Sequence, residues 1–279
     1  MALRTQLTNL MPRVLSALVA IGILWVALRW QPHGIFTLTL VAVGLCAYEF
    51  IGLAMSRSGL RATKLAFVAA AILTYLAFTL RPDTAILSAL LVWASLMASL
   101  LIQVRSPEDL SQVVQRQGWI SLGLIYCGVI PSLAPRLTGW DERGPLWLIT
   151  LLALVFVGDT CAYFVGLTMG KHKIFPALSP KKTIEGAVGG VAGSLSVGLA
   201  LWFAFFRDFS LFSFLLLCLL TALFAQTGDF FESLLKRAAN VKDSGQIMPG
   251  HGGILDRLDG VLFALPIYYA TAHALRILN

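Results

Sequence analysis

The residues best suited to chemistry are concentrated in one stretch of the chain, from Asp229 to Asp259, which holds nine of the 35 charged side chains. If residues 229–237 continue a preceding helix, four polar side chains share one face of it, namely Asp229, Glu232, Ser233 and Lys236. Mg²⁺ prefers one or two carboxylates together with substrate phosphates, and lysine or arginine binds phosphate oxygens. The pattern predicts a site for a cation and a phosphorylated ligand, with a plain salt-bridge network as the alternative.

A glycine-rich segment, Pro249 to Gly253, follows within the same stretch. Backbone N–H groups of such a turn can face a bound anion, especially just before a helix, which we expect to begin near Leu255. Asp256 and Asp259 would share a face of that helix, with Arg257 between them. A tight turn and a helix cap are the alternative explanation, but two carboxylates that flank an arginine beside three glycines favour ligand binding.

A second group of candidate residues lies upstream. Asp159 interrupts an apolar run, and an acid within a membrane helix usually has a function, although a hydrogen-bonded structural acid is the alternative. Lys181 and Lys182 precede another apolar run, where they either meet a triphosphate or mark the cytoplasmic face. Ser179 or Thr183 would cap the helix that follows.

The elements that position these residues are expected to be membrane helices. The chain has 279 residues, of which 58% are hydrophobic and 13% charged, against about 45–50% and about 25% in soluble domains. This excludes a soluble enzyme and a disordered chain. Runs of about 20 apolar residues cross a bilayer as helices, and nine such runs are present: 14–30, 34–55, 65–80, 84–104, 119–135, 146–169, 186–206, 210–228 and 255–275. Glu49 in the second run is a weaker site candidate.

The distribution of positive charge predicts the orientation. With the N-terminus inside and the C-terminus outside, 15 of the 21 Lys and Arg residues fall on inner segments, as the positive-inside rule requires. The longest inner segments are then 170–185 and 229–257, which carry both groups of candidate residues. Basic residues on the inner segments also explain the net charge of +7, so that charge does not require nucleic acid as a partner. The first run is interpreted as a retained helix rather than a cleaved signal peptide.

Five glycines follow Lys181 and Lys182: Gly186, Gly189, Gly190, Gly193 and Gly198. They come after no strand and lie within an apolar run, which argues against a nucleotide-binding loop. Small residues at helical spacing let membrane helices approach closely. We interpret these glycines as helix-packing positions.

The segment from Ser233 to Asp259 resembles the signature of phosphatidate cytidylyltransferases (CDP-diacylglycerol synthases): S-x-x-K-R, then K-D, P-x-H-G-G and D-R-x-D. Two upstream strings are similar to the same family, S-P-K-K-T-x-E-G from Ser179 and D-x-x-A-Y-F-x-G from Asp159. The resemblance covers roughly residues 150–275. It implies an all-α integral membrane enzyme that condenses CTP with phosphatidate to CDP-diacylglycerol and pyrophosphate.

The resemblance also implies roles for individual residues. Asp229 and Asp256 would bind Mg²⁺, with a second cation left open. The catalytic set would comprise Asp229, Lys236, Arg237, Asp256, Arg257 and Asp259. The substrate-binding set would comprise Asp159, Ser179, Lys181, Lys182, Glu232, Ser233, Lys242, Asp243, Gly250, His251, Gly252 and Gly253. No nucleophilic side chain is required, because the lipid phosphate is itself the nucleophile.

The expected organisation is an N-terminal scaffold, residues 1–145, and a catalytic region, residues 146–279. The scaffold is where oligomer contacts would form, a homodimer being one option. We expect a multi-pass protein of the cell (inner) membrane whose site faces the cytoplasm and takes CTP and inner-leaflet phosphatidate as partners. The alternatives are a CTP-dependent lipid kinase of the polyprenol type and, in another class, an ion-coupled transporter.

Overall fold

A computed structural model describes residues 18–30, 33–54, 61–101, 109–140, 142–245, 247 and 252–278. These residues are mostly helical, and the β pairing found among them is a single bridge between Lys173 and Thr183. The helices, after one over Leu18–Arg29, are α2 (His33–Ala54), α3 (Arg61–Leu80), α4 (Ala85–Leu101), α5 (Asp109–Gly123), α6 (Leu133–Thr138), α7 (Gly144–Met169), α8 (Ile184–Phe205), α9 (Leu211–Ala238) and α10 (Leu255–Leu278).

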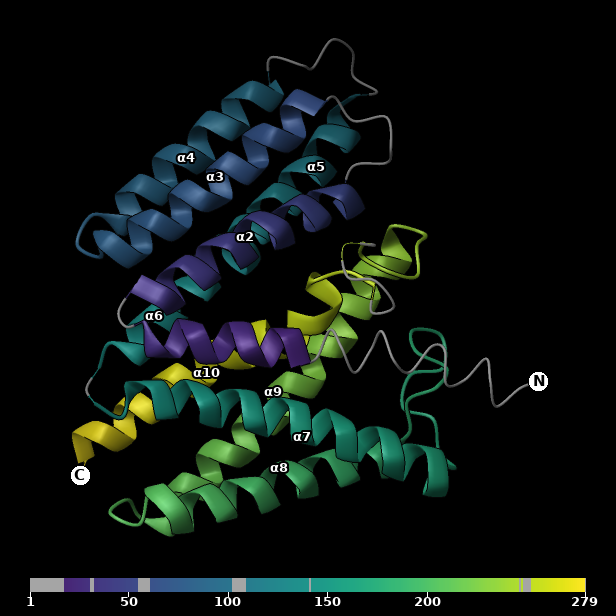
Figure 1. Cartoon of the computed structure of the whole chain (residues 1–279). Helices are drawn as coiled ribbons and strands as arrows, with labels where there is room; N and C mark the ends of the chain where they lie inside the picture. Colours follow the sequence, from purple (N-terminus) through teal and green to yellow (C-terminus); the bar gives the residue numbers. More distant parts are fainter. Residues whose placement is uncertain are drawn as a thin grey trace. The chain divides into compact units, whose positions relative to one another are not determined.

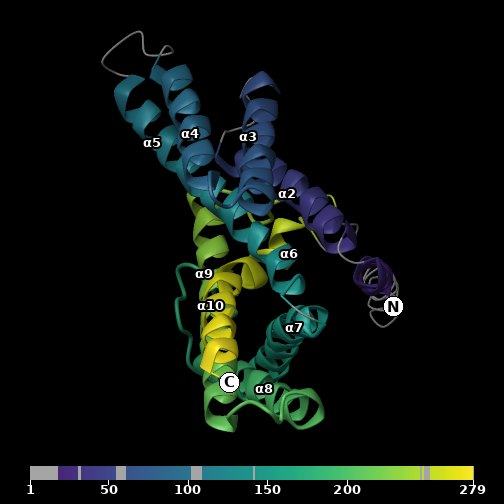
Figure 2. The ribbon, with the colours of Figure 1, turned by 90° about the vertical axis from the view of Figure 1, so that its left-hand side faces the viewer.

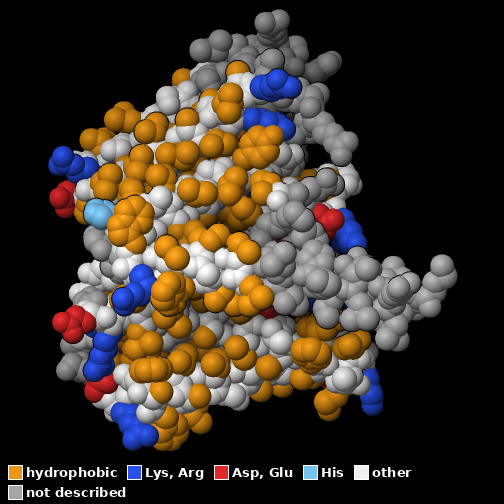
Figure 3. Space-filling model, viewed as in Figure 1, with side chains coloured by type: hydrophobic (Ala, Val, Ile, Leu, Met, Phe, Trp, Pro, Cys, Tyr) orange, Lys and Arg blue, Asp and Glu red, His pale blue; other side chains and the backbone are white. Residues whose placement is uncertain are grey.

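The described chain contains seven helical segments that are long and apolar enough to cross a membrane. Shorter apolar helices over Leu18–Arg29 and Ala85–Ala98 lie where the first and fourth runs were expected. In Figure 3 hydrophobic side chains cover most of the described surface in view, and the charged ones lie mainly toward its margins. The prediction of an all-α, multi-pass membrane protein is confirmed, whereas the number nine and the orientation of the termini stay predictions.

The expected fifth run is not a single regular helix. α5 passes into a π-helix over Leu124–Val129 and a 3₁₀ turn over Ile130–Ser132 before α6 begins. Pro131 lies in that turn, and proline supplies no N–H for an α-helical hydrogen bond. Sequence periodicity alone does not predict such a change of helix type, because the segment remains apolar throughout.

The chain divides into two compact units. The first comprises Met1–Arg136 with Ala239–Arg257, and the second comprises Leu137–Ala238 with Leu258–Asn279. In the first unit, Phe50 of α2 is fully buried against the rings of Phe67, Trp119 and Tyr126. In the second, the buried Trp147 packs on Phe206, Phe214 and Tyr268. Each unit therefore has its own aromatic core.

The second unit is built on the close approach of α7 and α8, which lie side by side in Figures 1 and 2. A Cβ atom on Gly189 would collide with Val165 of α7, and one on Gly193 would lie 2.5 Å from the Cys161 sulfur. Gly186, Gly190 and Gly198 also contact neighbouring helices at distances that leave no room for a side chain. The interpretation of these glycines as helix-packing positions is confirmed.

We predict that Gly193→Leu destabilises the protein, because the new side chain would force α8 away from Cys161. Overpacking of this kind costs about 1–3 kcal/mol, which should lower the melting temperature in detergent by a few degrees. Gly52→Leu in α2 is the matched control, because no atom lies within 4 Å of the position of its Cβ. Equal melting temperatures for the two variants would contradict the packing role.

Candidate active site

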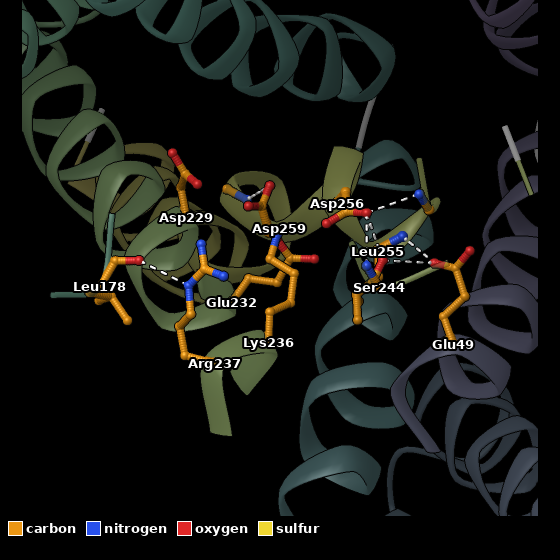
Figure 4. A network of polar contacts seen from close by, with 12 residues as sticks. Glu49, Leu178, Asp229, Glu232, Lys236, Arg237, Ser244, Leu255, Asp256 and Asp259 are labelled. Carbon is orange, nitrogen blue, oxygen red and sulfur yellow. Dashed lines mark hydrogen bonds and ion pairs between the residues drawn. The ribbon is translucent and has the colours of Figure 1, made fainter. Parts of the chain in front are cut away.

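The first candidate residues lie in the C-terminal part of α9. α9 continues without interruption through Lys236 to Ala238, which confirms that residues 229–237 extend the preceding helix. The Lys236 ammonium group lies 2.7 Å from the Glu232 carboxylate, one turn away, and the Glu232 side chain is 1% exposed. Figure 4 shows these side chains together with Asp229 and Arg237. One acid and one base of the predicted site therefore form a buried pair.

Further carboxylates surround this pair within the second unit. The buried Asp259 of α10 hydrogen-bonds with Glu232 and interacts electrostatically with Asp229 and Asp159. Glu232 and Asp259 are buried, and buried carboxylates that lie close together repel one another unless cations balance them. Their oxygen atoms are the ligands that Mg²⁺ accepts, alongside substrate phosphates. The donor set therefore fits a divalent cation held by one or two carboxylates and a bound phosphate.

The segment before α8 brings a lysine to this group. Lys182 forms an ion pair with Asp229 and lies 4.3 Å above the ring of Phe230. Thr183 caps α8, because its hydroxyl oxygen accepts a hydrogen bond from the Gly186 N–H at 3.1 Å. Thr183 is thus the capping residue of the two alternatives, whereas Ser179 lies in the turn that precedes it. Lys182 and Asp229, which were predicted from two separate groups of candidate residues, are therefore brought together.

Two residues that support this segment were not among the predicted site residues. The Glu185 carboxylate accepts hydrogen bonds from the backbone N–H groups of Lys171 and His172, at 3.0 and 3.2 Å. It also lies 2.5 Å from the His172 ring nitrogen. The contact between His172 and Glu185 requires the chain to turn back over 13 residues, and no periodic pattern in the sequence indicates such a turn. The one sequence signal for this contact was that Glu185 is the glutamate of the S-P-K-K-T-x-E-G string.

The glycine-rich segment belongs to the first unit, and its described part surrounds Asp256. One Asp256 oxygen accepts hydrogen bonds from the backbone N–H of Ser244 at 3.0 Å and of Gly253 at 2.9 Å. The Ser244 hydroxyl lies 2.9 Å from the same oxygen. Gly252 has a φ of +84°, a conformation that favours glycine. The Gly253 N–H, which we expected to face a bound anion, therefore binds a carboxylate of the chain.

A carboxylate from the N-terminal half completes this arrangement. Glu49 of α2 accepts hydrogen bonds from the Ile254 N–H at 3.1 Å and the Leu255 N–H at 2.9 Å. Figure 4 shows Glu49, Ser244, Leu255 and Asp256 linked by these contacts. α10 begins at Leu255, as predicted. Glu49 is a part of the site region that sequence reasoning had ranked low.

The remaining predicted residues fall into three groups. Arg237 donates a hydrogen bond to the Leu178 carbonyl at 3.4 Å. Two side chains, Ser179 and Ser233, are half-buried, and five are exposed: Asp159, Lys181, Lys242, Asp243 and Arg257. Gly250 and His251 lie outside the described residues.

The predicted metal ligands fall in different units, Asp229 in the second and Asp256 in the first. Among the residues that the structure describes, no group of three or more His, Cys, Asp or Glu side chains is arranged to hold a metal ion. The assignment of Asp229 and Asp256 as the ligands stays a prediction.

Comparison with known proteins gives several similar chains. Over 152 residues, 54% of this chain and 56% of the relative, it is 39% identical to the phosphatidate cytidylyltransferase of Bacillus subtilis (strain 168). It is 49% identical over 128 residues to that of Staphylococcus aureus (strain COL), which covers 45% of this chain and 48% of the relative. The chain therefore matches about half the length of these relatives.

The similarity to the family as a whole is more extensive. The model of the cytidylyltransferase family matches residues 11–275, which include both groups of candidate residues and nearly all the helices. Because that match spans far more than half of the sequence, the chain belongs to the cytidylyltransferase family.

Proposed function

We propose that this protein transfers the cytidylyl group of CTP to phosphatidate and so produces CDP-diacylglycerol and pyrophosphate. The observation that carries the proposal is the ion pair between Lys182, which belongs to the S-P-K-K-T-x-E-G string, and Asp229, which lies four residues before the signature that starts at Ser233. Lysines suited to phosphate and carboxylates suited to a cation thus lie together. The names of the relatives from Bacillus and Staphylococcus support the same substrates.

The reaction requires that two anions approach each other, so its barrier is largely electrostatic and positional. Lys182, Lys236 and Arg237 would bind phosphate oxygens and orient the lipid phosphate for attack on the α-phosphorus of CTP. Lys181 would bind the triphosphate or the lipid phosphate. Because the lipid phosphate is already ionised at neutral pH, no side chain has to act as a nucleophile, and no covalent enzyme intermediate forms.

Asp229 and Asp256 are each proposed as ligands for Mg²⁺, and divalent ions would neutralise negative charge on the phosphates. Glu232 would hold Lys236 in place for its phosphate contact, because the two side chains form a buried pair. Asp259 and Asp159 would contribute negative charge that favours the cation. His251 and its neighbouring glycines would shape the segment that receives the triphosphate.

The first prediction concerns the products. Purified protein with α-labelled CTP, phosphatidate and Mg²⁺ should move label into lipid and release pyrophosphate, and a chelator should abolish both. A lipid kinase would instead leave the label in CDP and transfer the γ-phosphate. Release of CDP with phosphorylated lipid would contradict the proposal, as would ion flux in liposomes without nucleotide turnover.

The second prediction concerns Asp229. Asp229→Asn should lower kcat by at least about a hundredfold, because several kcal/mol of charge stabilisation would be lost. Asp229 is a cleaner test than Asp256, which also holds Ser244 and Gly253. Asp208→Asn is the matched control, since Asp208 pairs with Arg143 at an exposed position, 53% accessible. Activity of Asp229→Asn close to that of the control would refute the metal role.

We also propose that nine helices cross the inner membrane, with the N-terminus and the site on the cytoplasmic side. The basis is the placement of 15 of 21 basic residues on inner segments. The N-terminal helices would serve as scaffold, with a homodimer as the simplest oligomer.

The third prediction tests this orientation. A cysteine that replaces Lys242 should react with an impermeant maleimide in inside-out vesicles but not in intact cells. A cysteine that replaces Arg207 should react in the opposite preparation. Cys46, Cys127 and Cys218 are buried, so replacing Cys161 by alanine gives a suitable background. Labelling of the Lys242 position from outside the cell would overturn the orientation.

A further inference from the structure

Glu49 lies in the N-terminal half of the chain, yet its carboxylate is bound to the segment that carries Asp256. Its two oxygens each accept a backbone hydrogen bond, one from Ile254 and one from Leu255, which is 206 positions away along the chain. The Ser244 hydroxyl lies 3.3 Å from Glu49 and 2.9 Å from Asp256. The Glu49 side chain is 3% exposed. The Glu49 carboxylate is therefore buried and bound to the backbone at the start of α10.

The contact meets a specific need of α10. The first N–H groups of a helix have no partner within the helix, and Leu255 is fully buried, so water does not supply one. A carboxylate at this end also interacts favourably with the helix dipole. Glu49 accepts the Leu255 N–H, which is the first of the helix, and the Ile254 N–H just before it, whereas Asp256 accepts the Gly253 N–H.

The loop is shaped to admit this side chain. A Cβ atom on Gly245 or on Gly253 would collide with the Glu49 carboxylate, so these two glycines allow the backbone to approach it. The same loop holds Ser244, which contacts both carboxylates. Glu49, which belongs to α2, therefore binds the backbone just before Asp256 as well as the serine that contacts the Asp256 carboxylate.

We propose that Glu49 is a positioning residue for the reaction of the proposed function. It fixes the start of α10 and, through Ser244 and the backbone at Ile254 and Leu255, the direction of the Asp256 carboxylate. Glu49 itself touches neither substrate nor cation in this role. The proposal rests on the proposed function, and it assigns the N-terminal helices a part in catalysis beyond that of a scaffold.

Glu49→Gln tests the proposal, because glutamine has the same shape but replaces one acceptor oxygen by an NH₂ donor facing a backbone N–H. We expect the amide hydrogens of Ile254 and Leu255 to exchange with deuterium at least tenfold faster than in the wild type. We also expect kcat to fall at least tenfold while KM for CTP changes less than threefold. Glu49→Asp keeps the charge on a shorter side chain and should give intermediate values.

Tyr75→Phe is the matched control for the loss of a buried hydrogen bond in the same unit. The Tyr75 hydroxyl donates to the Phe36 carbonyl at 3.0 Å, and its side chain is fully buried. This variant should lower the melting temperature as Glu49→Gln does, while kcat and exchange at residues 254–255 stay at wild-type values.

The outcomes separate the proposal from the proposed function. Unchanged exchange at residues 254–255 in Glu49→Gln, or a kcat loss matched by Tyr75→Phe, overturns the positioning role. If Glu49→Gln does not fold, wild-type kcat and exchange in Glu49→Asp overturn it instead. If the wild-type chain makes no CDP-diacylglycerol, the proposed function fails, and the exchange experiment still reports whether Glu49 holds the start of α10.

Discussion

A carboxylate removed from water needs donors or cations close by, and this requirement organises both units. Burial of an unpaired charge is strongly unfavourable, and two of the three buried acids among the described residues have donors that balance them. Glu232 has Lys236 on the next turn of α9, and Glu49 has two backbone N–H groups at the start of α10. Asp259 lies among other acids, where a cation would lower the repulsion. The few charges of an apolar chain therefore determine how several helices are arranged.

Much of the local structure could be predicted, because it follows from short-range rules. The continuation of α9 through Lys236 and the start of α10 at Leu255 follow from helical spacing and from glycines that end a loop. The α8 glycines follow from the need for small residues between membrane helices. These predictions depend on residues within a few turns of one another, where periodicity carries the information.

The parts that sequence reasoning missed depend on distant residues. Nothing in the sequence near Glu49 indicates that its partners lie at residues 254 and 255. Glu185 binds backbone N–H groups, which every residue except proline has, so the side-chain sequence does not identify its partners. The π-helix over Leu124–Val129 is likewise hidden in an evenly apolar segment. A glutamate in a membrane helix signals that some partner exists, but identifying the partner requires the fold.

The contact between Glu49 and α10 has a consequence for dividing the chain. A fragment that kept the signature from Ser233 to Asp259 but lacked α2 would leave the N–H groups of Ile254 and Leu255 without their acceptor. Each buried donor left unsatisfied costs about 1–3 kcal/mol, and Leu255 has no access to water. If the C-terminal half were fused to the helices of another protein, one of those helices would therefore have to supply an acidic side chain that accepts hydrogen bonds from the N–H groups at the first turn of α10.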